Sequence, residues 1–106
     1  MSATLVYVTA SSKDEAIKIA RTVVEERLAA CANVFQPMTS IYWWEGKVQE
    51  ESEISFILKT RDDLVEDLTR RVKALHSYTC PCVVALPVSQ GNGAFLAWIE
   101  NETRQN

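Results

Sequence analysis

Residues 34–59 read VFQPMTSIYWWEGKVQEESEISFILK, and this stretch decides the fold. Its first part, up to Trp44, is rich in β-branched and aromatic residues, which favour a strand. Glu45-Gly46-Lys47 follows and supplies the glycine that a tight reversal of the chain needs. The second part alternates between apolar and other side chains, with these apolar residues on one face: Ile54, Phe56 and Leu58. The stretch therefore predicts a long β-hairpin.

The segment before the hairpin predicts a strand followed by a helix. Residues 5–8 form a short apolar, β-favouring run that is typical of a buried strand. Ser12 with Glu15 three residues later matches a capping box and predicts the start of a helix. We expect the buried face of this helix to comprise Ile17, Ala20, Val24 and Leu28.

The segment after the hairpin repeats that order. Thr60 with Asp63 gives a second capping signal, and a second amphipathic helix is predicted to end near His76. Its apolar positions are Leu64, Val65, Leu68, Val72 and Leu75. Residues 83–88 predict another strand. A closing helix is expected to carry on one side Phe95, Trp98 and Ile99.

The predicted order is strand, helix, strand, strand, helix, strand, with an added C-terminal helix. This βαββαβ pattern is typical of an α+β, ferredoxin-like sheet with two helices on one face. The length of 106 residues matches a single domain, residues 1–106.

The hairpin also predicts self-association. Arms of about 12 residues would extend roughly 40 Å, whereas a compact domain of this length is only about 33 Å across. The predicted tip carries Tyr42, Trp43 and Trp44, and Pro37 predicts a bulge or an edge position in the first arm. Because an exposed apolar strand edge promotes uncontrolled pairing, we expect the hairpin to be covered in a closed oligomer.

Composition narrows the classes of function. The net charge of −3 gives no basic surface for nucleic acid or an anionic membrane. The N-terminal residues lack a secretion signal, and three cysteines are too few for a disulfide framework, so we expect free thiols in the cytoplasm. Hydrolase, P-loop and dinucleotide motifs are absent, so we expect no enzyme.

Several motifs in order resemble the CutA family of divalent-cation tolerance proteins. They are ERLAACAN at 26–33, TSIYWWEGK at 39–47, Lys59-Thr60, and Leu86-Pro87-Val88 followed by Gly91. The resemblance implies a ferredoxin-like homotrimer similar in architecture to the PII signalling proteins, with clefts between subunits. It also implies a link to copper or another divalent metal ion.

The chain departs from the family pattern at residues 76–82, which read HSYTCPC. Ser77 stands where the family has proline, and Cys82 where it has glutamate. If that glutamate serves the cleft as a hydrogen-bond acceptor or a hard ligand, Cys82 changes the chemistry there towards a soft thiolate. Cys80 and Cys82 with His76 therefore form a candidate metal site, because thiolates and imidazole bind Cu(I) or Zn(II). The alternative is that Cys82 packs, Cys80 is a surface thiol and His76 caps the helix end.

The remaining candidates lead to two hypotheses of function. Cys31 lies within a family motif and is a second choice as a metal ligand, with packing as the alternative. Lys59, Tyr78 and Trp98 match positions near the intersubunit clefts of the family, where a small anionic ligand would bind. The first hypothesis is a trimeric copper-binding protein. The second is a PII-like signalling or scaffold trimer that binds a small ligand.

Overall fold

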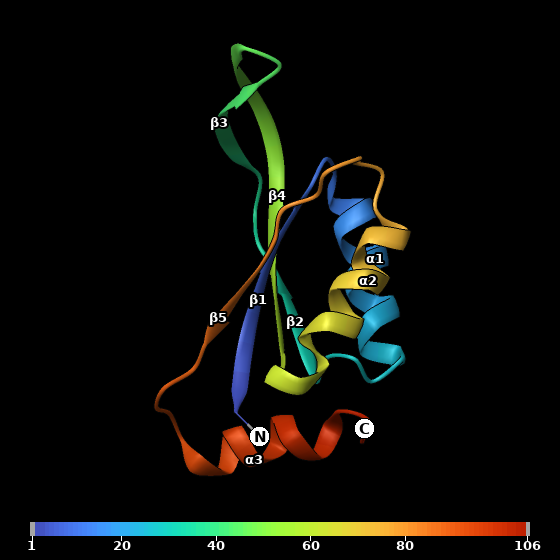
Figure 1. Ribbon diagram of the computed structural model, residues 1–106, viewed down its shortest axis with the longest axis vertical. Helices are drawn as coiled ribbons and strands as arrows, with labels where there is room; N and C mark the ends of the chain where they lie inside the picture. The colour runs from blue at the N-terminus through green and yellow to red at the C-terminus, as the bar shows by residue number, and fades with distance from the viewer. Residues whose placement is uncertain (1, 106) are drawn as a thin grey trace.

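The computed structural model describes residues 2–105, which form one sheet system and three α-helices. The strands and helices in chain order are β1 (Ala3–Ala10), α1 (Lys13–Glu25), β2 (Cys31–Val34), β3 (Met38–Trp44), β4 (Lys47–Arg61), the short 3-10 helix η1 (Asp62–Leu64), α2 (Val65–Leu75), β5 (Val83–Pro87) and α3 (Gly93–Glu102). The strand order is β2-β4-β1-β5, with β3 paired to β4 and all pairs antiparallel. Both α1 and α2 cover the same face of the sheet (Figure 1). The predicted α+β, ferredoxin-like class is confirmed.

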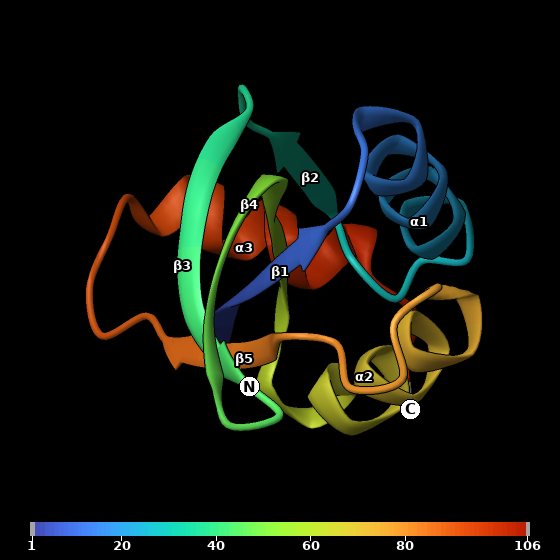
Figure 2. The same cartoon turned by 90° about the horizontal axis from the view of Figure 1, so that it is seen from above.

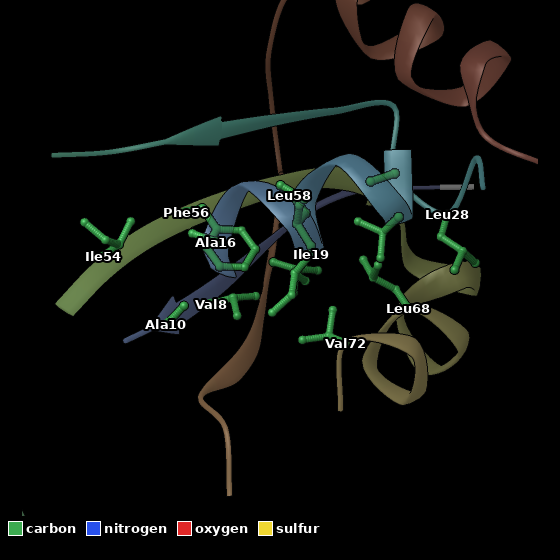
Figure 3. Close-up of a cluster of buried hydrophobic side chains, with 14 residues drawn as sticks. Val8, Ala10, Ala16, Ile19, Leu28, Ile54, Phe56, Leu58, Leu68 and Val72 are labelled. Atoms are coloured by element: carbon green, nitrogen blue, oxygen red, sulfur yellow. The ribbon is translucent and has the colours of Figure 1, made fainter. Parts of the chain in front are cut away.

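The core lies between this face and the two helices (Figure 3). The alternation predicted for β4 is confirmed, since Phe56 and Leu58 are fully buried and Ile54 nearly so. The predicted face of α1 is partly wrong. Ile17 is exposed, and the buried side chains are Ala16, Ile19, Ala20 and Val23. This second stripe is also regular at helical spacing, and its alanines allow the helix to lie close to the sheet.

One of the two predicted helix caps is confirmed and the other is wrong. The Ser12 hydroxyl accepts a 3.1 Å hydrogen bond from the Glu15 N–H. Thr60, in contrast, lies within β4, and its hydroxyl donates a 2.7 Å hydrogen bond to the Leu28 carbonyl. Leu28 itself lies beyond the end of α1, which Arg27 closes with a φ of 59°. The buried Leu28 carbonyl requires a hydrogen-bond donor, and Thr60 supplies it from within β4 and does not cap the next helix.

The hairpin is present, but its first arm is two strands instead of one. Between β2 and β3, residues 35–37 oppose only Ile54 and Ser55, which is the extra residue that defines a bulge. The bulge predicted at Pro37 is thus confirmed. Glu45 and Gly46 form the reversal with φ values of 51° and 77°, as a type I′ turn requires. The hairpin projects beyond the rest of the molecule (Figure 1), and with it the described chain extends 44 × 26 × 23 Å.

The sheet face opposite α1 and α2 is open over much of its area (Figure 2). Tyr7 pairs with Val84 and Leu5 with Leu86, so these four apolar side chains point to the same side. Val84 and Leu86 are 49% and 51% exposed. The third helix, α3, crosses the end of the sheet that lies away from the hairpin tip (Figure 1). Of its predicted apolar side, only Ile99 is buried.

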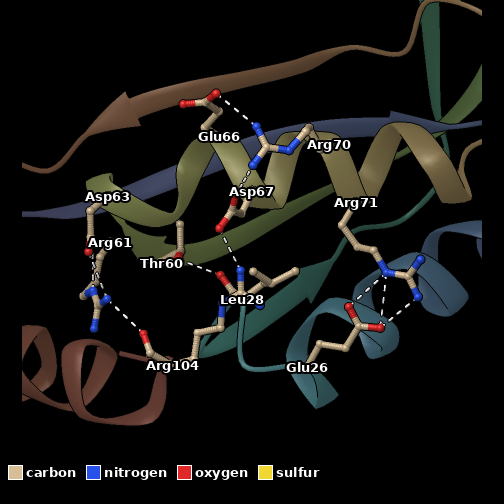
Figure 4. A network of polar contacts seen from close by, with 10 residues as sticks. All are labelled: Glu26, Leu28, Thr60, Arg61, Asp63, Glu66, Asp67, Arg70, Arg71 and Arg104. Carbon is tan, nitrogen blue, oxygen red and sulfur yellow. Dashed lines mark hydrogen bonds and ion pairs between the residues drawn. The ribbon is translucent and has the colours of Figure 1, made fainter. Parts of the chain in front are cut away.

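A polar network fixes the C-terminal segment to the rest of the fold (Figure 4). The Arg61 side chain is buried, and its guanidinium donates to Asp63 at 2.9 Å and to the Arg104 carbonyl at 2.9 Å. Arg104 in turn forms a 2.7 Å ion pair with Asp67 of α2. Within residues 2–105, no helix is long and apolar enough to cross a membrane.

Candidate functional site

A cavity of about 750 Å³ lies between the hairpin, from Met38 at its base to Trp44 near its tip, and the segment that precedes β5. The strands β1, β3 and β4 contribute one wall, and residues 78–82 contribute the other. The lining residues are Tyr7, Thr9, Met38, Ser40, Ile41, Tyr42, Trp44, Gln49, Glu51, Glu53, Tyr78, Thr79, Cys80 and Cys82. The bulge positions the start of β3 over this cavity, because it turns the hairpin out of the plane of the main sheet.

A hydrogen bond joins the two walls of the cavity. The Tyr78 hydroxyl donates to the Glu53 carboxylate at 2.8 Å. Burial raises the pKa of Tyr78, and the neighbouring Glu53 carboxylate raises it further. Partial burial and the Glu51 carboxylate likewise raise the pKa of Tyr42. Both phenols therefore remain protonated donors at neutral pH.

The electrostatic character of the cavity favours a cation. Glu51 and Glu53 contribute two carboxylates, and the described lining contains no lysine, arginine or histidine to neutralise them. Opposite charge is favoured at such a surface, and the aromatic faces of the tyrosines and Trp44 also attract cations. This differs from the small anionic ligand that the resemblance implies for Tyr78.

Two of the predicted metal ligands, Cys80 and Cys82, line this same cavity. Both are free thiols, with Cys80 exposed and Cys82 half-buried. Burial raises the pKa of Cys82, and the Glu53 carboxylate adds to the effect. The structure therefore brings the predicted thiol pair together at one wall, next to a carboxylate.

Both ring nitrogens of His76 form hydrogen bonds with backbone groups of the same chain. Its Nδ1 accepts from the Tyr78 N–H at 3.1 Å, so its Nε2 carries the proton and donates to the Thr9 carbonyl at 2.7 Å. Its ring also lies 4.6 Å from that of Tyr78, measured between centroids. Because both nitrogens are engaged, a metal ion would have to displace one of these bonds to bind His76.

The other predicted residues gather at a second place. Cys31 pairs with Lys59, which lies six residues along β4 from Glu53 and therefore about 20 Å from that residue. The Lys59 ammonium lies 5.3 Å from the centre of the Phe95 ring, which stacks on Trp98 at 5.4 Å. Within this chain, Lys59 and Trp98 are thus separated from Tyr78.

Sequence reasoning missed Met38, Glu51 and Glu53 as cavity residues. Counting back from the turn pairs Met38 with Glu53 and Ser40 with Glu51, so the hairpin register was the signal that could have found them. In the part of the chain that the structure describes, no group of three or more His, Cys, Asp or Glu side chains is arranged to hold a metal ion.

Comparison with known proteins gives consistent matches. The model of the family described as CutA1 divalent ion tolerance protein matches residues 4–102. The protein CutA 1, chloroplastic, of Oryza sativa is 45% identical over 96% of this chain, which spans 58% of the length of that relative. The divalent-cation tolerance protein CutA of Archaeoglobus fulgidus is 45% identical over 90% of this chain and 92% of its own length. The crystal structure of CutA1 from Oryza sativa superposes with a TM-score of 0.96 at 43% identity, covering 100% of this chain and 97% of that one.

Proposed function

The chain belongs to the CutA1 divalent ion tolerance protein family, and from that premise we propose that it acts in metal tolerance by binding copper as a homotrimer. Cys80 and Cys82 are the proposed ligands. The role is that of a binding protein without catalysis. A reducing compartment such as the cytoplasm would keep both thiols free for the metal.

The observation that supports this proposal is that two thiols line a cavity whose two carboxylates have no basic side chain beside them in the described lining. Cys80 and Cys82 line the same wall, and Glu51 and Glu53 face it without a lysine or arginine in the described lining. Thiolates prefer soft ions such as Cu(I), and the carboxylates attract any cation to the entrance. Cys82 stands where the family pattern has glutamate, so this chain's own residue adds the soft ligand.

Exposed apolar surface supports the homotrimer. The hairpin leaves large side chains in water, among them Trp43 at 74% and Ile41 at 67% exposure. The open sheet face adds Val84 and Leu86, which are about half exposed. A surface of this kind is typical of a protein interface, and a closed ring of subunits would cover it without leaving a free edge.

A competitive titration tests the metal proposal. Reduced wild-type protein is titrated with Cu(I) against a chromophoric chelator, beside the Cys80→Ser, Cys82→Ser double variant and a Cys31→Ser control. We expect one ion per chain in the wild type and in the control, and loss of that ion in the double variant. Equal uptake by all three proteins would refute the role of the cavity thiols.

A second candidate function rests on the size of the cavity. A volume of about 750 Å³ is far larger than a metal ion needs and lies in the range of small-molecule sites. A PII-like signalling or scaffold trimer that holds an organic ligand would use this space. Thermal stabilisation of the Cys80→Ser, Cys82→Ser variant by a small organic cation, with no dependence on copper, would favour this second candidate.

A further inference from the structure

The cavity contains a third sulfur atom that is not part of the proposed thiol pair. The sequence has two methionines, and Met38, at the start of β3, lines the same cavity as Cys80 and Cys82. The Tyr7 hydroxyl of β1 approaches the Met38 Sδ at 3.9 Å, which is a weak contact. The three sulfur-bearing residues come from segments about 40 residues apart in the chain, and the hairpin brings them to one space.

The strand register explains why Met38 faces the cysteine segment. Met38 pairs directly with Glu53 on β4, so both side chains leave the hairpin on the same side. Glu53 accepts the hydrogen bond from Tyr78, which holds residues 78–82 against this point of the hairpin. Cys82 also lies close enough to the Glu53 carboxylate for its pKa to be raised by it. Met38 and Cys82 thus border the same carboxylate from opposite walls.

The nitrogen ligands that a harder metal would require are not available here. Both ring nitrogens of His76 are hydrogen-bonded within the fold, and this is the one histidine in the sequence. Zn(II) in proteins takes four ligands in a tetrahedron, usually thiolate and imidazole, and no group of that kind exists among residues 2–105. Thiolate and thioether sulfurs instead select Cu(I).

We propose that Cys80, Cys82 and Met38 form an all-sulfur site that takes copper as Cu(I), with the Met38 thioether as the third ligand. This inference rests on the proposed function, since it assumes that copper binds in the cavity. The ion binds without a change of oxidation state and displaces the two thiol protons, which pass to solvent. The specificity of this chain would therefore be for a soft monovalent ion, although its family is named for divalent ones.

Selenomethionine gives a direct test of the third ligand. Protein labelled at both methionines is loaded with one equivalent of Cu(I), and X-ray absorption is recorded at the copper edge. We expect a copper–selenium path in the labelled wild type and its loss in labelled Met38→Leu, which keeps Met1 and a side chain of similar volume. A spectrum of the wild type with sulfur neighbours alone would overturn the proposal, and this reading needs no variant to fold.

Affinity measurements separate this inference from the function on which it rests. We expect Met38→Leu to bind Cu(I) about 10-fold more weakly than wild type, and Cys31→Ser to bind it equally well. Unchanged affinity in Met38→Leu, together with loss in the Cys80→Ser, Cys82→Ser variant, would reject the thioether ligand and leave the thiol site intact. Retention of copper by the double cysteine variant would reject the proposed function itself. Zn(II) binding as tight as Cu(I) binding would also overturn the all-sulfur site.

Discussion

The Tyr78 hydroxyl donates a 2.8 Å hydrogen bond to the carboxylate of Glu53, and so joins the cysteine segment to the base of the hairpin. The two residues lie 25 positions apart, on opposite walls of the cavity. This bond positions the backbone of residues 78–82 relative to β4. Together with the bonds from His76 to the Thr9 carbonyl and from the Ser77 N–H to Glu15, it holds the segment that carries both thiols in place.

The variant Tyr78→Phe removes that donor and leaves a half-buried carboxylate without it. We expect a loss of about 1–2 kcal/mol in the free energy of unfolding, because a hydrogen bond to a charged group contributes more to stability than a hydrogen bond between neutral groups. Urea denaturation at a fixed protein concentration measures the change. Tyr7→Phe is the matched control, since its hydroxyl makes only the 3.9 Å contact with Met38 in the same cavity. Equal losses in the two variants would mean that the Glu53 bond has no special role.

The buried Thr60 hydroxyl gives a second prediction about stability. It is fully buried and donates at 2.7 Å to the Leu28 carbonyl in the turn after α1. Thr60→Val keeps the shape but leaves that carbonyl without this donor, so we expect a cost of about 1–3 kcal/mol by thermal or urea unfolding. Thr22→Val removes an exposed hydroxyl that bonds the Lys18 carbonyl, and should change stability by less than about 0.5 kcal/mol.

Most of the fold could be predicted because its strands, helix starts and bulge depend on residues that are close together in the sequence. The alternation at Ile54, Phe56 and Leu58, the cap at Ser12 and the bulge at Pro37 all follow from neighbouring residues, and the structure confirms them. Thr60 was misread as a cap because its partner, the Leu28 carbonyl, lies 32 residues away. A long-range contact of that kind leaves no trace in the local pattern.

The candidate site was predicted only in part for the same reason. Cys80 and Cys82 are only two positions apart in the chain, so their spacing alone made them a candidate pair of ligands, and both line the cavity. Met38 and Glu53 reach that wall only through the hairpin register and the Tyr78 hydrogen bond. The engagement of the His76 Nε2 likewise depends on Thr9, 67 residues away. Tertiary partners of this kind cannot be deduced from the spacing of ligand types.

The ion pair between Glu26 and Arg71 predicts a dependence of stability on pH. The Arg71 guanidinium hydrogen-bonds the Glu26 carboxylate at 2.8 Å and holds the pKa of that carboxyl below its ordinary value of 4.5. Because the pKa of Glu26 is lower in the folded than in the unfolded protein, the ion pair stabilises the fold at pH values above the unfolded-state pKa. This contribution is lost as the pH falls through the folded-state pKa. We therefore expect a double-mutant cycle of Glu26→Gln and Arg71→Gln to give a small favourable coupling at pH 7. The coupling should weaken as the pH is lowered through the folded-state pKa of Glu26, and a coupling that stays constant with pH would contradict the assignment.

The hairpin tip allows the proposed homotrimer to be tested without any metal. Trp43 is 74% exposed in the single chain and pairs with Val48 across the hairpin, so only contacts with another subunit could bury it. Light scattering of the wild type should give three times the chain mass of 11.9 kDa. Trp43→Glu places a charge where the proposed interface is apolar, and desolvating an unpaired carboxylate is costly, so we expect its mass to fall toward that of one chain at micromolar concentration. Trp43→Phe keeps an apolar ring and should remain trimeric. A wild type with the mass of one chain, or a Trp43→Glu variant that is still trimeric, would show that the hairpin tip does not hold subunits together.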